Sequence, residues 1–250
     1  VRKRAPAMLN DELVTCCKRL RLSRTLADTS DFAETKTPEE YLLYVLKREL
    51  EHREKNRRDR LLKAAGFHSW KTFDNYHFDD IKLPAGVTPE YLAKAAFVEE
   101  KKNLILYGNV GTGKTHLATA IGIEACRRGL RTGFYRTAHL VNRLSEAKKE
   151  GKLGKLVTSL GKLDLLICDE WGYVPLDREA AQLLFQIISD SYEQRSVIIT
   201  TNLEFSRWVG IFYDEQMTAA MIDRLIHHGY LLLFDGPSNR VRESLMRQGG

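Results

Sequence analysis

The sequence has no long apolar run. Nowhere in its 250 residues is there a stretch approaching the roughly 20 apolar residues that a membrane-spanning helix needs. Residues 1–6 are basic, and no apolar signal segment follows them. We therefore expect no membrane association and predict that the protein works in the cytoplasm.

Cysteines are few, and their spacing forms no motif. Cys16 and Cys17 are adjacent, Cys126 falls in a predicted helix and Cys168 in a predicted strand. This spacing suits neither a zinc site nor a disulfide framework, and the seven histidines are equally scattered. We interpret the cysteines as buried free thiols. The sequence also lacks internal repeats and low-complexity tracts.

Positive charge is concentrated near the amino end. The net charge is +6, and residues 1–70 hold 16 of the 39 Lys and Arg but only 11 of the 33 Asp and Glu. A basic module joined to a near-neutral one suggests a polyanionic partner, most often nucleic acid. A well-solvated helix surface has the same composition, so charge alone leaves both interpretations open.

A complete phosphate-binding motif, G-x-x-x-x-G-K-[ST], lies between a predicted strand and a predicted helix. Its glycines let backbone N–H groups wrap a polyphosphate, and the helix N-terminus that follows adds positive potential. Lys114 can reach the β- and γ-phosphates, and the Thr115 hydroxyl is placed to bind Mg²⁺. The residues predicted to bind the nucleotide are Gly108, Asn109, Val110, Gly111, Thr112, Gly113, Lys114, Thr115 and His116.

From residue 103 onward, strand and helix patterns alternate, which predicts an α/β fold with a parallel sheet between two helical layers. The predicted strands cover residues 104–107, 133–136, 163–168, 197–200 and 230–234. The predicted helices cover residues 115–128, 138–149, 178–193, 205–212 and 218–227. We therefore expect a three-layer αβα sandwich with a five-stranded parallel sheet.

Two domains are predicted: a small all-helical domain over residues 1–67, and a nucleotide-binding domain over residues 68–250 with a linker at its start and a minimal lid at its end. A helix over residues 89–100 should begin at Thr88 as N-cap. Aromatic residues of the linker either pack on an adenine ring or anchor the linker on the core. They are Trp70, Phe73, Tyr76 and Phe78.

A long charged helix is predicted in the first domain. It should begin with Thr37 as N-cap and with Glu40 completing a capping box. Farther along, Arg53, Arg57 and Arg60 share one face and could follow a DNA backbone. The alternative is that they form ordinary surface pairs with nearby acids. Those acids are Glu51, Glu54 and Asp59.

Two acids end the apolar strand predicted over residues 163–168. Because the carboxyl ends of parallel strands border the ligand crevice, Asp169 should lie beside the phosphate loop and hold Mg²⁺, directly or through water. Glu170 can polarise a water for attack on the γ-phosphate. Asn202, after the next strand, can contact the γ-phosphate or orient that water; alone, it would be an ordinary turn residue.

The motifs together resemble AAA+ ATPases, and in detail the IstB family of transposition helper ATPases, which is close to the DnaC and DnaA branch of helicase loaders and initiators. The similar segments are residues 111–118, Asp169-Glu170 with Gly172-Tyr173, residues 175–177 and residues 205–208. The resemblance implies that Asn202 is sensor 1, that Arg224 is an arginine finger offered to a neighbouring subunit's ATP, and that Arg240 is sensor 2, with Arg242 as the other candidate.

The resemblance also suggests a DNA contact. In the initiator and loader branch of AAA+ proteins, the region after the second strand's helix faces the central channel. Here that region is a basic segment with glycines, which we predict to be a loop that touches the DNA backbone, with solvated charge as the alternative. Its lysines are Lys148, Lys149, Lys152 and Lys155.

The family resemblance implies an ATPase that uses Mg²⁺, assembles as a ring or helical filament on double-stranded DNA, and so associates with the bacterial nucleoid. It would act as a transposition helper that selects target DNA and recruits or stimulates a transposase. Three alternatives remain open: a DnaC-like replicative helicase loader, a small-molecule kinase built on the same phosphate loop, and a DNA-coating protein in which ATP only licenses assembly.

Overall fold

The computed structural model describes residues 7–23, 26, 37–74, 76–173 and 176–238, with side chains from residue 11 onward. The chain divides into two compact units, Val1–Arg60 and Leu61–Gly250. Among the described helices, none is long and apolar enough to cross a membrane.

The first unit contains helix α1 (Ala7–Arg19) and most of helix α3 (Pro38–Ala64). The predicted capping box is present: Glu40 N–H donates to Thr37 Oγ1 at 3.2 Å, and Thr37 N–H donates to the Glu40 carboxylate at 3.3 Å. Farther along α3, Glu49 is buried. Burial alone would raise the pKa of the Glu49 carboxyl, but hydrogen bonds from Arg53 and Ser23 hold that pKa below its ordinary value.

The second unit is built on one sheet with the strand order β1-β6-β2-β5-β4-β3. Its strands are β1 (Ile81–Lys82), β2 (Asn103–Gly108), β3 (Thr132–Arg136), β4 (Leu165–Trp171), β5 (Ser196–Thr201) and β6 (Gly229–Phe234). Strands β2 to β6 are parallel and correspond to the five predicted ones. The sheet has six strands rather than five, because the two-residue β1 pairs antiparallel with the end of β6. So short a strand has no periodic pattern of its own.

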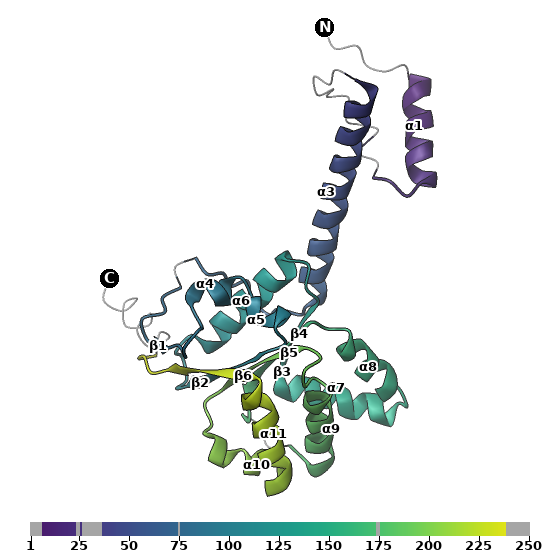
Figure 1. The fold of residues 1–250 in the computed structure, drawn as a ribbon. Coiled ribbons are helices and arrows are strands. Elements are labelled where there is room, and N and C mark those ends of the chain that lie inside the picture. Colours follow the sequence, from purple (N-terminus) through teal and green to yellow (C-terminus); the bar gives the residue numbers. More distant parts are fainter. Residues whose placement is uncertain (1–6, 24–25, 27–36, 75, 174–175, 239–250) are drawn as a thin grey trace, which may run out of the picture. The chain divides into compact units, whose positions relative to one another are not determined.

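Helices cover both faces of the sheet (Figure 1), which gives the expected three layers. One face packs against α4 (Pro89–Ala93), α5 (Ala96–Glu99) and α6 (Lys114–Arg127). The other packs against α7 (Thr137–Lys149), α8 (Leu153–Gly161), α9 (Arg178–Ser189), the 3₁₀ turn η1 (Phe205–Arg207), α10 (Val209–Phe212) and α11 (Glu215–His227). The strands are buried on both sides, so their ends are the places where polar side chains can gather.

Three predictions, one of a loop and two of helices, need correction. The basic segment predicted as a loop contains the end of α7 and the start of α8, because Leu153, Leu156, Val157 and Leu160 give α8 an apolar face at helical spacing. The single helix predicted over residues 89–100 is broken into α4 and α5 at Ala95, although Thr88 caps it as expected. The helix predicted over residues 205–212 is a 3₁₀ turn followed by α10.

The cysteines are free thiols, as predicted. Cys17, Cys126 and Cys168 are buried, whereas Cys16 is exposed, so the prediction of burial fails for that residue. Burial raises the pKa of Cys168 to about 12, and the negative charge of the neighbouring Asp169 acts in the same direction, so the thiol is uncharged at neutral pH.

Candidate active site

The predicted phosphate loop joins β2 to α6, and residues from the end of β6 and beyond it pack closely against two of its glycines. A Cβ on Gly108 would lie 2.2 Å from the carbonyl oxygen of Phe234. A Cβ on Gly111, whose φ is +84°, would lie 2.1 Å from Oγ of Ser238. Gly108 is therefore required because the Phe234 backbone leaves no space for a side chain, and Gly111 because its backbone conformation disfavours one.

Lys114 begins α6 and folds back over the loop. Its Nζ donates hydrogen bonds to the carbonyl oxygens of Gly108 at 2.7 Å and Asn109 at 2.6 Å. The Thr112 hydroxyl donates to the Asn109 carbonyl at 2.8 Å, which closes the loop on itself. The ammonium group is thus held beside the backbone N–H groups that would surround a phosphate.

Asp169 lies near the end of β4 and is almost completely buried, at 2% exposure. Its Oδ1 accepts a hydrogen bond from the Thr115 hydroxyl at 2.9 Å, so the structure brings these two predicted metal ligands together. A hydroxyl and a carboxylate side by side next to a phosphate loop fit Mg²⁺, which takes one or two protein oxygens and completes its shell with water and phosphate. In the described part of the chain, no cluster of three or more His, Cys, Asp or Glu offers a different metal site.

Glu170 follows Asp169 but is exposed, and it adopts a positive φ of +59°. Its carboxylate lies 3.7 Å from Nε of Arg136, the last residue of β3. Asn202 is also exposed and directly follows β5, the strand beside β4. The Glu170 carboxylate, predicted to activate water, and the Asn202 amide, predicted to contact the γ-phosphate or orient that water, are therefore at the same edge of the sheet as the phosphate loop.

One of the four linker aromatics, Tyr76, contacts the phosphate loop. Phe73, Tyr76 and Phe78 pack against the core, as the anchoring interpretation holds, whereas Trp70 is 58% exposed. The Tyr76 hydroxyl donates to the Gly113 carbonyl at 3.3 Å, and burial raises the pKa of Tyr76 above its ordinary value.

His116, the third residue of α6, contacts Tyr76 and the linker. His116 of α6 stacks at a tilt on Tyr76, with ring centroids 4.9 Å apart, and one of its ring nitrogens lies 2.8 Å from the Thr72 carbonyl oxygen. The sequence marked Tyr76 as a linker aromatic but not as a residue that contacts the phosphate loop. Ser238 was missed, because no local pattern marked its contact with Gly111.

Arg224 lies at the opposite edge of the sheet, near the end of α11. Its backbone carbonyl accepts from the side chain of Asn103, which begins β2, whereas the phosphate loop starts where β2 ends. Its guanidinium donates to Ser189 Oγ at 2.7 Å and stacks over the ring of Phe185, at 5.3 Å from the centroid. The structure therefore does not bring Arg224 to the phosphate loop of its own chain. Arg240 and Arg242, the sensor 2 candidates, lie outside the described residues.

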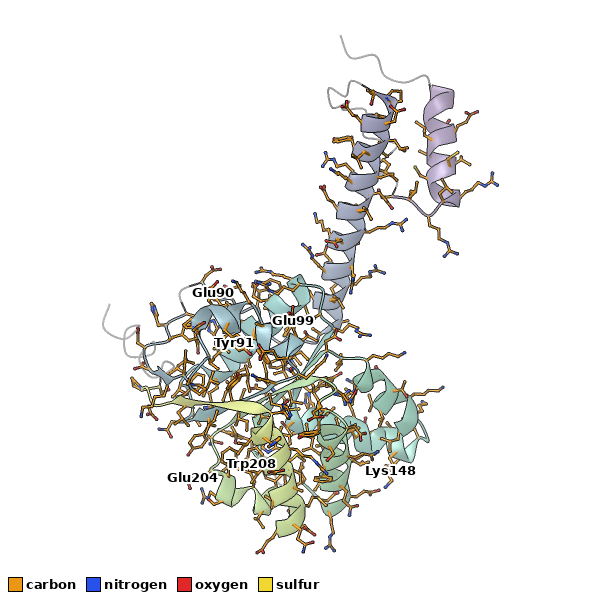
Figure 2. The ribbon with its side chains drawn as sticks, viewed as in Figure 1. Glu90, Tyr91, Glu99, Lys148, Glu204 and Trp208 are labelled. Carbon is orange, nitrogen blue, oxygen red and sulfur yellow. The ribbon has the colours of Figure 1, made fainter. Side chains whose placement is uncertain are left out.

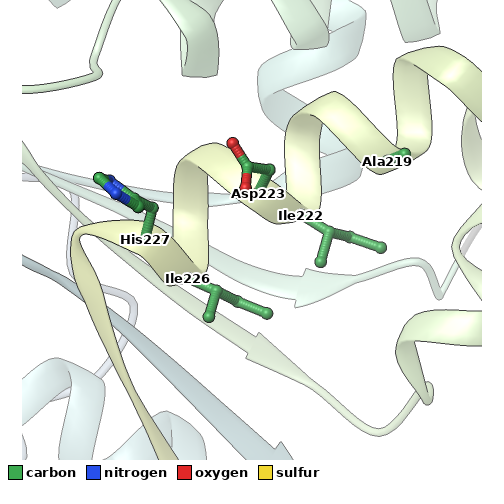
Figure 3. A pocket seen from close by; sticks show the side chains of 5 residues that line it. All are labelled: Ala219, Ile222, Asp223, Ile226 and His227. Atoms are coloured by element: carbon green, nitrogen blue, oxygen red, sulfur yellow. The ribbon is translucent and has the colours of Figure 1, made fainter.

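The candidate DNA-binding lysines fall into two groups. Lys148, labelled in Figure 2, lies at the end of α7 and forms an ion pair with Glu179 of α9. Lys152 forms an ion pair with Glu150 at 2.8 Å. Lys149 and Lys155 are exposed, and no ion pair of theirs occurs within the described residues. Lys149 and Lys155 are therefore more available to contact a phosphate than Lys148 and Lys152.

Of the candidate arginines in the first unit, Arg53 pairs with Glu49 at 2.7 Å, and Arg60 Nε donates to the Asn56 carbonyl at 3.2 Å. Arg57 is exposed on the same helix. The carboxylate of the buried Glu49 thus holds Arg53, so the predicted basic stripe is weaker at this position.

The phosphate loop, the aspartate at the end of a neighbouring strand and the three-layer fold together define an AAA+ P-loop ATP-binding protein. A family model described as IstB-like ATP binding protein matches residues 17–247, and the chain belongs to this family. The resemblance inferred from the motifs is therefore confirmed.

Relatives and solved structures agree with this assignment. The chain is 36% identical, over 84% of its length and 83% of the relative's, to a protein named as ATP-binding in insertion sequence IS5376 of Geobacillus stearothermophilus. It is also 36% identical, over 82% of its length and 77% of the relative's, to a protein named likewise in insertion sequence IS21 of Pseudomonas aeruginosa.

Among solved structures, the DnaC helicase loader shares 27% identity with a TM-score of 0.51, covering 70% of this chain and 98% of that one. AMPPCP-bound DnaA from Aquifex aeolicus has a TM-score of 0.55 at 21% identity, covering 73% of this chain but only 56% of that one, so it supports the fold alone.

Proposed function

We propose that this protein hydrolyses ATP with Mg²⁺, at sites completed between two copies of the chain assembled on double-stranded DNA. The observation that carries the proposal is that the two acids and Arg224 lie at opposite ends of the parallel strands. Asp169 and Glu170 lie at the edge that holds the phosphate loop, whereas Arg224 lies at the opposite edge. From this position, the Arg224 guanidinium can contact only a nucleotide that is bound to another copy of the chain.

The residues divide the chemistry among them. The phosphate loop and Lys114 bind the β- and γ-phosphates. Thr115 and Asp169 would hold Mg²⁺, which neutralises charge on those phosphates. Glu170 accepts a proton from the attacking water, and Asn202 orients that water against the γ-phosphate. Arg224 of a neighbouring copy stabilises the charge that develops in the transition state.

In this proposal the assembly serves transposition as a helper that selects target DNA and recruits or stimulates a transposase. The support is family membership together with two relatives named for insertion sequences. Double-stranded DNA is the proposed polyanion because exposed cations lie on α7, α8 and α3. The helical domain of residues 1–67, including Arg53, Arg57 and Arg60, is proposed to make subunit or DNA contacts.

The proposal is tested by measuring Mg²⁺-dependent ATP turnover per chain at rising protein concentration, with and without duplex DNA. Turnover should rise with concentration and reach its plateau at lower concentration when DNA is present, because assembly completes the sites. Turnover per chain that stays constant over a hundredfold concentration range would exclude a shared site. Transfer of the γ-phosphate to an acceptor other than water would make the protein a kinase.

A replicative helicase loader is the second candidate, favoured by the match that covers 98% of the DnaC helicase loader chain. It would bind a hexameric helicase and single-stranded DNA. Pull-downs against a transposase and a replicative helicase separate the two roles. Capture of the helicase but not the transposase would replace the transposition role while leaving the hydrolysis proposal intact.

A further inference from the structure

Strand β4 contains a bulge at the two acids. Cys168 pairs with Ile199 and Trp171 pairs with Thr201, so the two residues between them on β4 face a single residue, Thr200, on β5. This mismatch explains how adjacent residues acquire such different surroundings, with Asp169 buried and Glu170 exposed.

One hydroxyl group contacts both acids. Thr200 is 2% exposed, and its Oγ1 donates a hydrogen bond to Asp169 Oδ1 at 2.5 Å. The same Oγ1 accepts a hydrogen bond from Glu170 N–H at 3.0 Å. The hydroxyl thus uses its donor on the carboxylate of one acid and an acceptor site on the backbone of the next.

The hydrogen bonds to Asp169 are unevenly divided between its oxygens. The hydroxyls of Thr115 and Thr200 both donate to Oδ1. Within the described residues, Oδ2 accepts none of the hydrogen bonds found. The two threonines therefore fix the carboxylate through one oxygen and leave the other for Mg²⁺ or a water bound to it.

The bond to Glu170 acts on its backbone. A φ of +59° is unusual for a residue with a side chain and persists only where its surroundings hold it. The hydrogen bond from Glu170 N–H to Thr200 provides such a restraint at the bulge. Without this restraint, the backbone could relax and the Glu170 carboxylate would change direction.

We propose that Thr200 is the positioning residue for both acids: its hydroxyl orients the Asp169 carboxylate toward the metal ion and holds Glu170 in the backbone conformation that presents its carboxylate to water. This inference rests on the proposed function and adds to it a residue that touches neither nucleotide nor metal.

The test replaces the hydroxyl with a methyl group. Thr200→Val keeps the side-chain shape but removes both hydrogen bonds, and Thr200→Ser restores the hydroxyl. Thr201→Val is the matched control, because Thr201 is the next residue of β5 and 3% exposed. Its hydroxyl also donates one hydrogen bond, to the Trp171 carbonyl, and accepts one, from Leu203 N–H, both at 3.0 Å.

The primary readout is the affinity for Mn²⁺ of the ADP-bound protein, measured by electron paramagnetic resonance, with metal-free ADP affinity and ATP turnover measured alongside. Thr200→Val should weaken Mn²⁺ binding by about 10- to 100-fold and lower kcat by a similar factor, as losing a partner of a metal ligand does. Metal-free ADP affinity should change by less than about threefold, since the phosphate loop is intact. Thr200→Ser should recover most of both losses.

An equal loss of Mn²⁺ affinity in Thr201→Val would overturn the inference, because the effect would then be loss of sheet packing. Unchanged Mn²⁺ affinity in Thr200→Val, or no recovery in Thr200→Ser, would also overturn it. If Thr200→Val does not fold, Thr200→Ala makes the same comparison with a smaller side chain. Absence of turnover in the unaltered protein would defeat the proposed function, whereas the Mn²⁺ comparison would still decide the role of Thr200.

Discussion

Nε of Arg136 lies 3.7 Å from a carboxylate oxygen of Glu170, and both side chains are about half exposed, at 49% and 48%. The pair joins the end of β3 to the bulge of β4, two neighbouring strands of the sheet. A carboxylate turned toward a guanidinium is less available to a water molecule, so the pair opposes the proposed action of Glu170 on water.

Arg136→Ala should therefore raise ATP turnover in the absence of DNA by about two- to fivefold, the range expected for losing an exposed ion pair. Arg143→Ala is the control, because Arg143 lies on α7 and its guanidinium stacks over the ring of Tyr135, at 5.5 Å from the centroid. Steady-state turnover of both variants decides the matter. A tenfold fall in Arg136→Ala would mean that Arg136 assists the reaction instead.

Mixing two inactive variants tests the placement of Arg224. Arg224→Ala lacks the finger and Glu170→Gln lacks the base, so each alone should lose at least about 100-fold in kcat. In an equimolar mixture, a Glu170→Gln copy can offer its Arg224 to the intact Glu170 of the other variant. Turnover should recover to about a quarter of that of the unaltered protein.

Ser189→Ala is the matched control for that mixture, because it removes only the partner to which Arg224 donates. It should keep turnover within about threefold of the unaltered protein, because it removes a single part-buried hydrogen bond and leaves Arg224 itself in place. No recovery in the mixture, although both variants bind ATP and assemble, would show that Arg224 does not act between copies.

The lysines near α8 should contribute unequally to DNA binding. Lys149→Ala with Lys155→Ala should lower duplex affinity and reduce the slope of log K against log salt by about 2, since each phosphate contact contributes about 0.9. Lys148→Ala with Lys152→Ala should have a smaller effect, because these lysines are paired with Glu179 and Glu150. Fluorescence anisotropy at several salt concentrations makes the comparison. Equal slopes in both double variants and the unaltered protein would remove this segment from the DNA contact.

Asp164, which immediately precedes β4, predicts a pH dependence of stability. Burial raises the pKa of its carboxyl, but hydrogen bonds from the side chain and backbone of Arg131 outweigh burial and hold that pKa below its ordinary value. The stabilisation is therefore present above the unfolded pKa of about 3.9 and is lost as pH falls through the lower, folded pKa.

Asp164→Asn should accordingly lower the free energy of unfolding by about 1–2 kcal/mol at pH 7. The difference from the unaltered protein should shrink as pH falls below about 4. Denaturant unfolding at pH 7 and pH 3.5 measures both values. A difference that is the same at the two pH values would mean that the charge of Asp164 is not what stabilises the fold.

Local patterns made much of the fold predictable. The phosphate motif occupies eight consecutive residues, and four of the five parallel strands, β2, β4, β5 and β6, contain a continuous apolar run. Asp169 and Glu170 could be placed near the loop because the carboxyl ends of parallel strands share one edge. Helix α8 was also readable, since four apolar residues at helical spacing lie within it, but its glycines and lysines favoured a loop.

Contacts that depend on pairing between distant segments could not be predicted in the same way. The bulge at Glu170 is set by the register of β4 against β5, and register is fixed by packing rather than by either strand alone. For this reason Asn202 could be predicted as a site residue from the sequence, whereas Thr200, two residues earlier, could not. The contact of Ser238 with Gly111 and the pairing of β1 with β6 likewise join residues far apart in the chain.

The separation of Arg224 from the phosphate loop has a consequence for any assembly of this chain. If the arginine of every site comes from the next copy, an open row of copies has polarity. At one end, a copy binds a nucleotide that no Arg224 contacts. At the other end, the Arg224 of the last copy has no nucleotide to contact. A row of n copies then contains n − 1 working sites, so activity per copy depends on length, and only a closed ring has no idle end.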